Sequence, residues 1–184
     1  IPHNINSYYT EAQLEEIQSK FDGKAEYDNG EIVLSSNTSI KHNSIKGNIL
    51  ASLIMYFRKT NCKPYDEQIE VIFKNESELH KYKPDVFVMC DNSEKQGESF
   101  ISPPKIVFEI VSRSTANHDY ITKLYVYQKF GVLEYNIVEQ NGFIVQYSLI
   151  DEQYEITNTF KSGDVYRSSV FKDLTIDLTD IFED

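Results

Sequence analysis

No apolar run of about 18 or more residues occurs in this sequence of 184 residues, and its start lacks the charged and then apolar pattern of a secretion signal. A helix that crosses a bilayer needs about 20 apolar residues. We therefore expect a protein that neither spans nor crosses a membrane. The chain begins at Ile1 rather than at methionine, and we expect that some N-terminal sequence precedes it.

Cysteine is scarce, and its two positions, Cys62 and Cys90, lie in dissimilar sequence surroundings. They form neither a CxxC motif nor a Cys/His spacing of the kind that binds zinc. Disulfides are rare in the reducing cytoplasm. We therefore expect two reduced thiols in a cytoplasmic protein.

Basic residues are outnumbered: 18 Lys and Arg stand against 29 Asp and Glu, which gives a net charge of −11. Phosphate binding normally requires a basic surface, so this charge balance argues against a nucleic-acid partner without excluding one. An acidic nuclease would depend on a local basic groove and on bound metal. No internal repeat or low-complexity segment occurs, and the length predicts one domain over residues 1–184.

Helix and hairpin signals occupy the first third of the chain. A capping box at Thr10–Gln13 predicts a short helix, and Asn29-Gly30 predicts the turn of a hairpin within 26–34. Apolar residues then recur at every fourth position over about 40–59, which predicts a long helix. His42 falls on the buried side of its first turn, where a structural histidine is more common than a catalytic one.

Strands dominate the rest of the sequence. The nearly unbroken apolar run Ile106–Val111 predicts a central strand that is buried on both faces. A helix is predicted from His118 to about Phe130, with Gly131 as its left-handed cap. Further strands are predicted at 63–73, 84–89, 132–138, 143–150, 154–160 and 164–170. The fold class is α/β (α+β): a mixed sheet flanked by helices, with a C-terminal antiparallel extension.

The helix predicted over 118–130 has two faces of different character. One face carries Ile121, Leu124 and Phe130, which we expect to pack on the core. The other carries polar residues at four-residue spacing, Asp119, Lys123 and Tyr127. This helix directly follows the central strand and therefore presents Lys123 to it.

Two predicted strands each carry one carboxylate in apolar surroundings. Asp85 lies at the mouth of its strand, and Glu109 lies inside the central strand, on the face of Val107 and Val111. A buried, ionised carboxylate costs several kcal/mol unless it is compensated. Glu109 therefore needs a cationic partner.

Two kinds of partner satisfy this need. With a magnesium or manganese ion, Asp85 and Glu109 would form an oxygen-rich site, and Lys123 could hold a water and stabilise charge on a phosphate. That combination is typical of metal-dependent phosphodiester hydrolysis. Alternatively, Asp85 caps a turn and Glu109 pairs with Lys123 in a purely structural network. Spacing alone leaves both open.

The ordered set of motifs around these residues carries a family resemblance. Tyr82-Lys83-Pro84-Asp85-Val86-Phe87-Val88 is followed by Pro103-Pro104-Lys105-Ile106-Val107-Phe108-Glu109-Ile110-Val111-Ser112-Arg113-Ser114-Thr115, then by Asp119, Lys123, Tyr127 and Gly131-Val132-Leu133-Glu134-Tyr135. Together with residues from about Asp22 onward, this set resembles the Uma-two family of restriction endonucleases. That family belongs to the PD-(D/E)xK nuclease-like superfamily.

The resemblance implies a restriction-endonuclease-like fold in which a β-hairpin holds Asp85 and Glu109. It also implies metal-dependent cleavage of nucleic acid, with Mg²⁺ or Mn²⁺ held by these two carboxylates. The superfamily's lysine usually stands two positions after the acidic residue, where this chain has Val111. Members of the family look as though this lysine has moved to the following helix, which points to Lys123 as the third catalytic residue.

Second-tier candidates also follow from the resemblance. Glu26 and His42 match family positions near the proposed site, and Asp119 and Tyr127 share the helix face of Lys123. Arg113 could contact a phosphate, although a solvated loop arginine is the commoner case.

The sequence departs from the family's usual residues at three positions. Arg113 replaces a proline, Asn136 an aromatic residue and Asn29 an aspartate. None of these changes removes a proposed ligand, although each leaves the geometry of its loop open.

A second hypothesis is that the chain keeps a nuclease-like fold for binding or self-association, without catalysis. The acidic composition and the lack of an evident basic stripe favour it. It predicts a homodimer and no loss of function on replacement of Lys123. The first hypothesis predicts a nucleic-acid partner, DNA before RNA.

Overall fold

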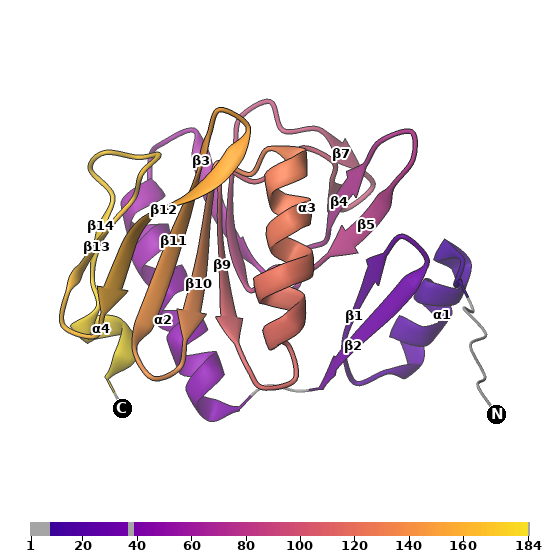
Figure 1. Ribbon diagram of the computed structural model, residues 1–184, viewed down its shortest axis with the longest axis horizontal. Helices are drawn as coiled ribbons and strands as arrows, with labels where there is room; N and C mark the ends of the chain where they lie inside the picture. The colour runs from indigo at the N-terminus through magenta and orange to yellow at the C-terminus, as the bar shows by residue number, and fades with distance from the viewer. Residues whose placement is uncertain (1–7, 37–38, 184) are drawn as a thin grey trace.

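The computed structural model describes residues 8–36 and 39–183 (Figure 1). Strands predominate, and the helices are few. In chain order the elements are α1 (Glu11–Lys20), β1 (Gly23–Asp28), β2 (Glu31–Ser36), α2 (Ile40–Phe57), β3 (Cys62–Asp66), β4 (Val71–Lys74), β5 (Leu79–Tyr82), β6 (Val86–Cys90), β7 (Lys95–Gln96), β8 (Ser99–Phe100), β9 (Ile106–Val111), a π-helix (His118–Thr122), α3 (Lys123–Phe130), β10 (Glu134–Glu139), β11 (Phe143–Ile150), β12 (Gln153–Lys161), β13 (Val165–Arg167), β14 (Thr175–Asp177) and α4 (Thr179–Phe182).

Two six-stranded sheets form the framework. The first has the order β2-β1-β5-β4-β8-β7, and the second has the order β12-β11-β10-β9-β6-β3. Within the second sheet, β9 runs parallel to β10 and antiparallel to β6. Val86 at the start of β6 pairs with Phe108 of β9, so Asp85, which directly precedes β6, comes beside Glu109.

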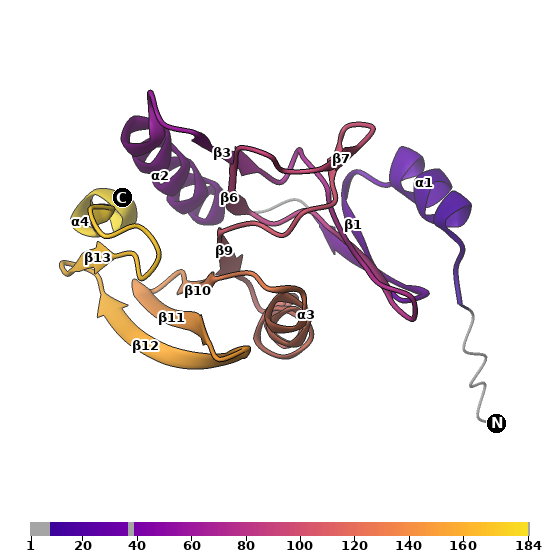
Figure 2. The ribbon, with the colours of Figure 1, turned by 90° about the horizontal axis from the view of Figure 1, so that it is seen from above.

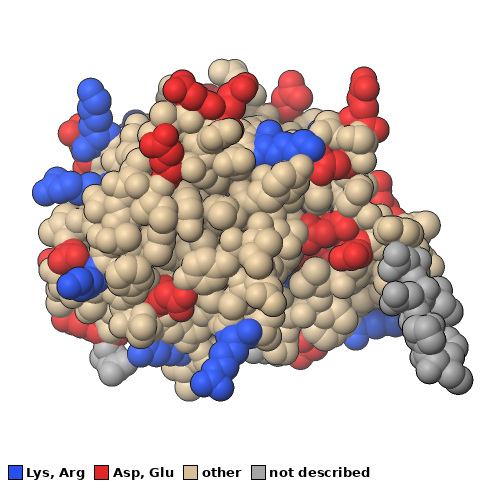
Figure 3. Space-filling view, in the orientation of Figure 1, with Lys and Arg blue, Asp and Glu red and all other residues tan. Residues whose placement is uncertain are grey.

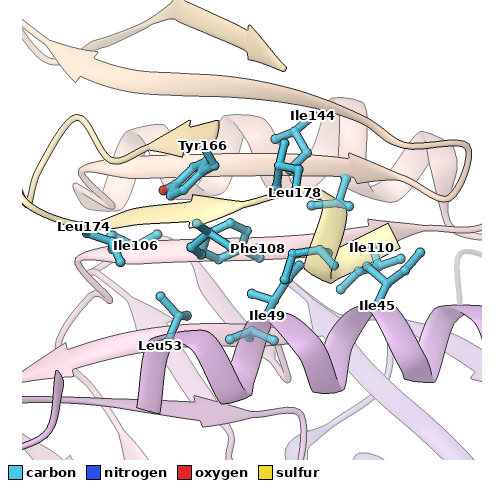
Figure 4. Close-up of a cluster of buried hydrophobic side chains, with 14 of the residues drawn as sticks. Ile45, Ile49, Leu53, Ile106, Phe108, Ile110, Ile144, Tyr166, Leu174 and Leu178 are labelled. Atoms are coloured by element: carbon cyan, nitrogen blue, oxygen red, sulfur yellow. The ribbon is translucent and has the colours of Figure 1, made fainter. Parts of the chain in front are cut away.

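The second sheet is covered on both faces (Figure 2). Helix α2 and the C-terminal segment, which runs from β13 to α4 (165–182), cover one face. Their apolar side chains pack on Ile106, Phe108 and Ile110 of β9 (Figure 4). Helix α3 and strands β4 and β5 of the first sheet cover the other face, against Val107 and Val111. Because both faces are buried, every residue of β9 is 6% exposed or less, Glu109 included.

Local signals account for the element boundaries. The capping box opens α1, since the Thr10 hydroxyl accepts from the Gln13 N–H and the Gln13 side chain accepts from the Thr10 N–H. Asn29 and Gly30 both have positive φ, as a tight turn between β1 and β2 requires. Gly131 ends α3 at φ 86°. These predictions, and those of α2 and β9, are confirmed.

The prediction of one strand over 63–73 is wrong, because this stretch forms two strands that lie in different sheets. A turn at 67–70 separates β3 from β4. The alternating pattern continues through this turn, so it gave no sign of the break. The prediction that Ile121 packs on the core is also wrong: this side chain is 66% exposed. Lys123, Val126 and Tyr127 occupy the buried face instead.

The expectation of reduced thiols is wrong as well. Cys62 and Cys90 stand opposite each other on the antiparallel strands β3 and β6 and form a disulfide. They are 28 residues apart, and only the pairing of the two strands brings them together. The thiol argument therefore no longer supports a cytoplasmic location. Among the described residues, no helix has both the length and the apolarity needed to cross a membrane.

The C-terminal segment is tied to the sheet by a buried carboxylate, Glu134 of β10. Its oxygens accept hydrogen bonds from the Tyr166 and Ser168 hydroxyls, from the Ser169 N–H and hydroxyl, and from the Asn136 amide. Charge-assisted hydrogen bonds of this number compensate the burial of the carboxylate. Asn136 thus serves as a donor to Glu134, while the Tyr166 ring packs on Phe108 and Phe160.

Candidate functional site

Asp85 and Glu109 are locked together across two neighbouring strands. The Asp85 N–H donates to Glu109 Oε1 at 2.8 Å, and the Ile110 N–H donates to Asp85 Oδ2 at 2.7 Å. Each carboxylate is therefore held by the backbone of the other's strand. Asp85 is 5% exposed and Glu109 1%. The two acids that the sequence singles out therefore lie next to each other.

Lys123 reaches Glu109 from α3, as the sequence predicts. Its Nζ contacts Glu109 Oε2, lies 3.0 Å from Glu26 Oε1 and 3.9 Å from Asp119 Oδ1, and sits over the Tyr82 ring. Burial alone would lower the pKa of Lys123, but Glu109, Glu26 and Asp119 raise it well above its usual value. Lys123 is therefore a fixed cation near neutral pH.

Two residues of the polar face of the helix, Lys123 and Tyr127, contact Glu109, and the third, Asp119, contacts Lys123. Asp119, Lys123 and Tyr127 are all buried, and the Tyr127 hydroxyl donates to Glu109 Oε2 at 2.9 Å. The chain is π-helical at Asp119 and becomes α-helical at Lys123. π-helical turns are frequent at functional sites. The buried side of the helix is therefore the one that carries its polar residues, and not the one that carries Ile121.

Strand β1 contributes a row of charged residues that the sequence analysis found only in part. Lys24, Glu26 and Asp28 occupy alternate positions and so share one face of the strand, while Ala25 and Tyr27 pack under α1 on the other. The alternation of charged and apolar residues was the available signal for Lys24 and Asp28. Glu26 Oε2 accepts from the Lys83 N–H at 2.7 Å.

Lys24 supplies a second amine, which is half-buried and lies beside Asp85. Its Nζ lies 3.5 Å from Asp85 Oδ1 and donates to the Lys83 carbonyl at 3.0 Å. Burial alone would lower the pKa of Lys24, but Glu26 and Asp85 raise it above its usual value. Burial would raise the pKa of Asp85, but Lys24 and His42 hold it below its ordinary range. Each of the two central carboxylates thus has its own lysine.

His42 lies in the first turn of α2, which Ser39 caps. Its Nε2 is 3.1 Å from the Ile110 carbonyl oxygen and 3.4 Å from Asp85 Oδ2, so these two oxygens converge on one point. Its Nδ1 is buried and makes no hydrogen bond to the described part of the chain. The sequence placed His42 on the buried side of the helix correctly, and the fold brings it to the site.

These side chains meet in a cavity of about 510 Å³. Its lining includes most of the charged residues discussed above and two histidines: Lys24, Glu26, His42, Asp85, Glu109, His118, Asp119 and Lys123. Asp28 is not part of the lining. Tyr127 lies behind Glu109, outside the lining. Arg113 is exposed and does not line the cavity, although its neighbours Ser112 and Ser114 do.

The buried centre of the cavity holds more acid than base. Glu26, Asp85, Glu109 and Asp119 face Lys24 and Lys123, while the Lys83 amine at the cavity wall donates to Gln18. Burial, with the nearby charges of Glu109 and Asp85, raises the pKa of Asp119 to about 8 even though Lys123 opposes the shift. A divalent cation would relieve this excess charge, and carboxylate oxygens are the donors that Mg²⁺ and Mn²⁺ prefer. The donor set thus fits such an ion.

Few oxygen atoms of the cavity are placed to bind a divalent cation. In the described residues, no three His, Cys, Asp or Glu side chains are grouped so that they could hold a metal ion by themselves. The oxygens available are those of Asp85 and Glu109 and the Ile110 carbonyl that converges with Asp85. An ion here would complete its coordination with water or substrate, as Mg²⁺ commonly does.

The raised pKa of Asp119 predicts a pH-dependent stability difference. The folded state keeps a proton on Asp119 up to about pH 8, whereas the unfolded chain releases it near pH 4. The wild type therefore loses stability relative to Asp119→Asn as pH rises, by about 1 kcal/mol per pH unit between pH 5 and pH 8. Urea unfolding of both proteins at several pH values measures this gap.

Asp173→Asn is the matched control, because Asp173 is exposed. Its stability should stay parallel to that of the wild type over the same pH range. A constant gap between Asp119→Asn and the wild type would show that Asp119 is ionised throughout, and that the acidic centre is less crowded than its geometry indicates.

Charge on the outer surface is mixed. On the face seen in Figure 3, Lys and Arg side chains are scattered among acidic ones without forming a continuous stripe. The amines of Lys24, Lys83 and Lys123 instead belong to residues of the cavity wall. Beside the acidic residues of its lining, the cavity therefore offers these three lysines to a phosphate.

Comparisons with known proteins agree with this architecture. The profile of the Uma2 family, described as "Putative restriction endonuclease", matches residues 12–179. No curated protein matches the sequence. One similar solved structure is that of a "putative nuclease belonging to DUF820" from Anabaena variabilis ATCC 29413. It superposes with a TM-score of 0.71 at 16% identity over 92% of this chain and 96% of that chain. The likeness establishes a restriction-endonuclease-like fold.

Proposed function

This chain belongs to the Uma2 family of restriction-endonuclease-like proteins, and we propose that it is a metal-dependent nuclease that hydrolyses phosphodiester bonds, with DNA as the first candidate substrate. One observation carries the proposal. Asp85 and Glu109, from adjacent strands, line the same cavity as the ammonium of Lys123. Two buried acids and a fixed cation beside a cavity are what hydrolysis of a phosphodiester requires.

Asp85 and Glu109 are the residues that would hold Mg²⁺ or Mn²⁺, with the Ile110 carbonyl as a further oxygen donor. When bound, such an ion neutralises charge on the phosphate and makes phosphorus more open to attack. The protein's contribution is rigidity. Both carboxylates are fixed by backbone N–H groups before any ligand arrives, so little reorganisation is needed.

Lys123 would stabilise the negative charge that develops on the phosphate and hold the attacking water in line. It is suited to this role because Glu26 and Glu109 fix its amine and keep it charged. Tyr127 and Glu26 are then positioning residues, one behind Glu109 and one beside Lys123. Arg113, which projects from the loop between Ser112 and Ser114 at the cavity wall, is the candidate for contact with a phosphate further along the strand.

The second candidate function is self-association or binding without catalysis. The specific observation in its favour is that both oxygens of Glu109 are already bonded within the protein, to the Asp85 N–H, to Lys123 and to Tyr127. A carboxylate satisfied in this way is stable without metal. Sedimentation velocity tests this candidate, which predicts a homodimer that is unaffected by Lys123→Ala.

Cleavage of supercoiled plasmid DNA tests the primary proposal. Protein is incubated with plasmid in Mg²⁺, Mn²⁺ or Ca²⁺, or with EDTA, and nicked and linear products are separated on a gel. We expect nicking with Mg²⁺ or Mn²⁺, none with EDTA, and a rise in the unfolding temperature with either active metal. Single-stranded DNA and RNA in parallel reactions identify the substrate. A purified wild type that neither binds these metals nor cleaves any of these substrates would refute the proposal.

A further inference from the structure

Hydrolysis of a phosphodiester releases a proton from the attacking water, and Lys123 and the carboxylates around it are poorly suited to take it. Lys123 is held in its charged form by three carboxylates. Asp119 carries its own proton near neutral pH, since its pKa is raised to about 8. Glu109 and Glu26 are engaged with Lys123. Another cavity residue is needed for the proton.

His118 lines the same cavity from the start of the π-helix. Its Nε2 lies 2.7 Å from Asp28 Oδ2, and its ring stands at 89° to that of Tyr82 with the centroids 5.5 Å apart. The side chain is 9% exposed. A hydrogen bond on one nitrogen and an aromatic wall on the ring fix the orientation of the imidazole.

Asp28 is built to hold this histidine. Besides His118, it accepts hydrogen bonds from His80 Nδ1 at 3.0 Å and from the Tyr82 hydroxyl. Burial alone would raise the pKa of Asp28, but the three hydrogen bonds keep it below its ordinary range. The carboxylate is therefore ionised, and an ionised acceptor requires the hydrogen of neutral His118 to be on Nε2. The lone pair is then on Nδ1.

The free nitrogen faces the catalytic charges. His118 Nδ1 lies 3.8 Å from Glu26 Oε1, which is beyond a direct hydrogen bond but can be spanned through one water. The same Glu26 oxygen is 3.0 Å from Lys123 Nζ. Orientation of an imidazole by a buried aspartate, with the other nitrogen directed at a reaction site, is the arrangement that general-base catalysis uses.

We propose that His118, held by Asp28, is the general base of the site and takes the proton of the attacking water; this inference rests on the proposed nuclease function. The water oxygen forms a bond to phosphorus, and the bond from phosphorus to the leaving sugar oxygen breaks with its electron pair on that oxygen. The proton of the water passes to Nδ1. The leaving oxygen takes a proton from solvent, and His118 later returns its proton to solvent. Asp28 and Glu26 stabilise the imidazolium in between.

Steady-state nicking of plasmid by His118→Gln and Asp28→Asn, at saturating Mg²⁺ or Mn²⁺, tests this role. We expect kcat to fall about 100-fold to 1000-fold in each variant, with KM and the metal-induced rise in unfolding temperature unchanged. His80→Gln is the matched control, because His80 contacts the same Asp28 but does not line the cavity. Its activity should fall far less. Added imidazole should restore part of the activity of His118→Ala, which a structural role would not allow.

A measurement without turnover tests the geometry separately. Long-range proton–nitrogen NMR spectra of the histidine rings, assigned with the His118→Gln variant, should show His118 as the Nε2–H tautomer at high pH. Protonation of Nδ1 instead would overturn the inference whatever the activity. An active wild type with an equally active His118→Gln, or with His80→Gln equally impaired, would overturn it and leave the nuclease proposal intact. An inactive wild type would refute both.

Discussion

Glu109→Gln is expected to remove metal-dependent nicking of plasmid DNA, with a loss on the order of 10³-fold or more. The substitution keeps the size of the side chain, and the amide oxygen can still accept from Lys123. It removes the charge that would bind a divalent ion and that compensates the ammonium. The loss should appear in kcat and in metal affinity together, measured by gel quantification and by titration of metal into the protein.

Glu134→Gln provides the matched control for Glu109. Glu134 is also a fully buried carboxylate and lies on the neighbouring strand β10, but it faces the C-terminal segment and does not line the cavity. We expect this variant to lose stability while keeping nicking activity per folded molecule. Equal loss of activity in both variants would mean that the effect of Glu109→Gln comes from unfolding and not from the site.

Lys123→Met is expected to lower the free energy of unfolding by about 3 to 5 kcal/mol in the absence of metal. The Lys123 side chain is 1% exposed and its ammonium lies between Glu109 and Glu26, so its removal leaves two buried carboxylates without the cation that both contact. Methionine fills much of the volume, which separates the loss of charge from the loss of packing. Urea unfolding monitored by circular dichroism measures the change.

Two comparisons sharpen this test. Lys129→Met alters the same helix six residues later, where the lysine pairs with Glu78 at the surface, and the stability of this variant should barely change. Added Mg²⁺ should restore part of the stability of Lys123→Met, because a divalent ion can replace the missing positive charge. A variant as stable as the wild type in EDTA would contradict this prediction and show that Lys123 does not stabilise the two carboxylates.

The sequence by itself determined most of the local structure. Capping residues, an Asn-Gly turn, four-residue periodicity and an unbroken apolar run depend only on neighbouring residues, and α1, the first hairpin, α2 and β9 follow them. The same reasoning gave the central acids: a carboxylate inside the apolar strand β9 needs a cation, and Lys123 on the next helix supplies it. Asp85, Glu109 and Lys123 therefore lie together as the residues of the strand and helix indicate.

Only the tertiary structure decided which distant residues complete the cavity. Lys24 and His118 line the cavity, and Asp28 contacts His118 from outside the lining. β1 carries Lys24 and Asp28, and it reaches the site because it pairs with β5, which ends beside the start of β6. The Cys62–Cys90 disulfide likewise follows from the pairing of β3 with β6. Local propensity carries no information on the pairing of strands, since pairing is fixed by burial summed over both sheets. Local sequence therefore determines the main strands and helices and the central acids, whereas strand pairing determines which other charged residues surround those acids.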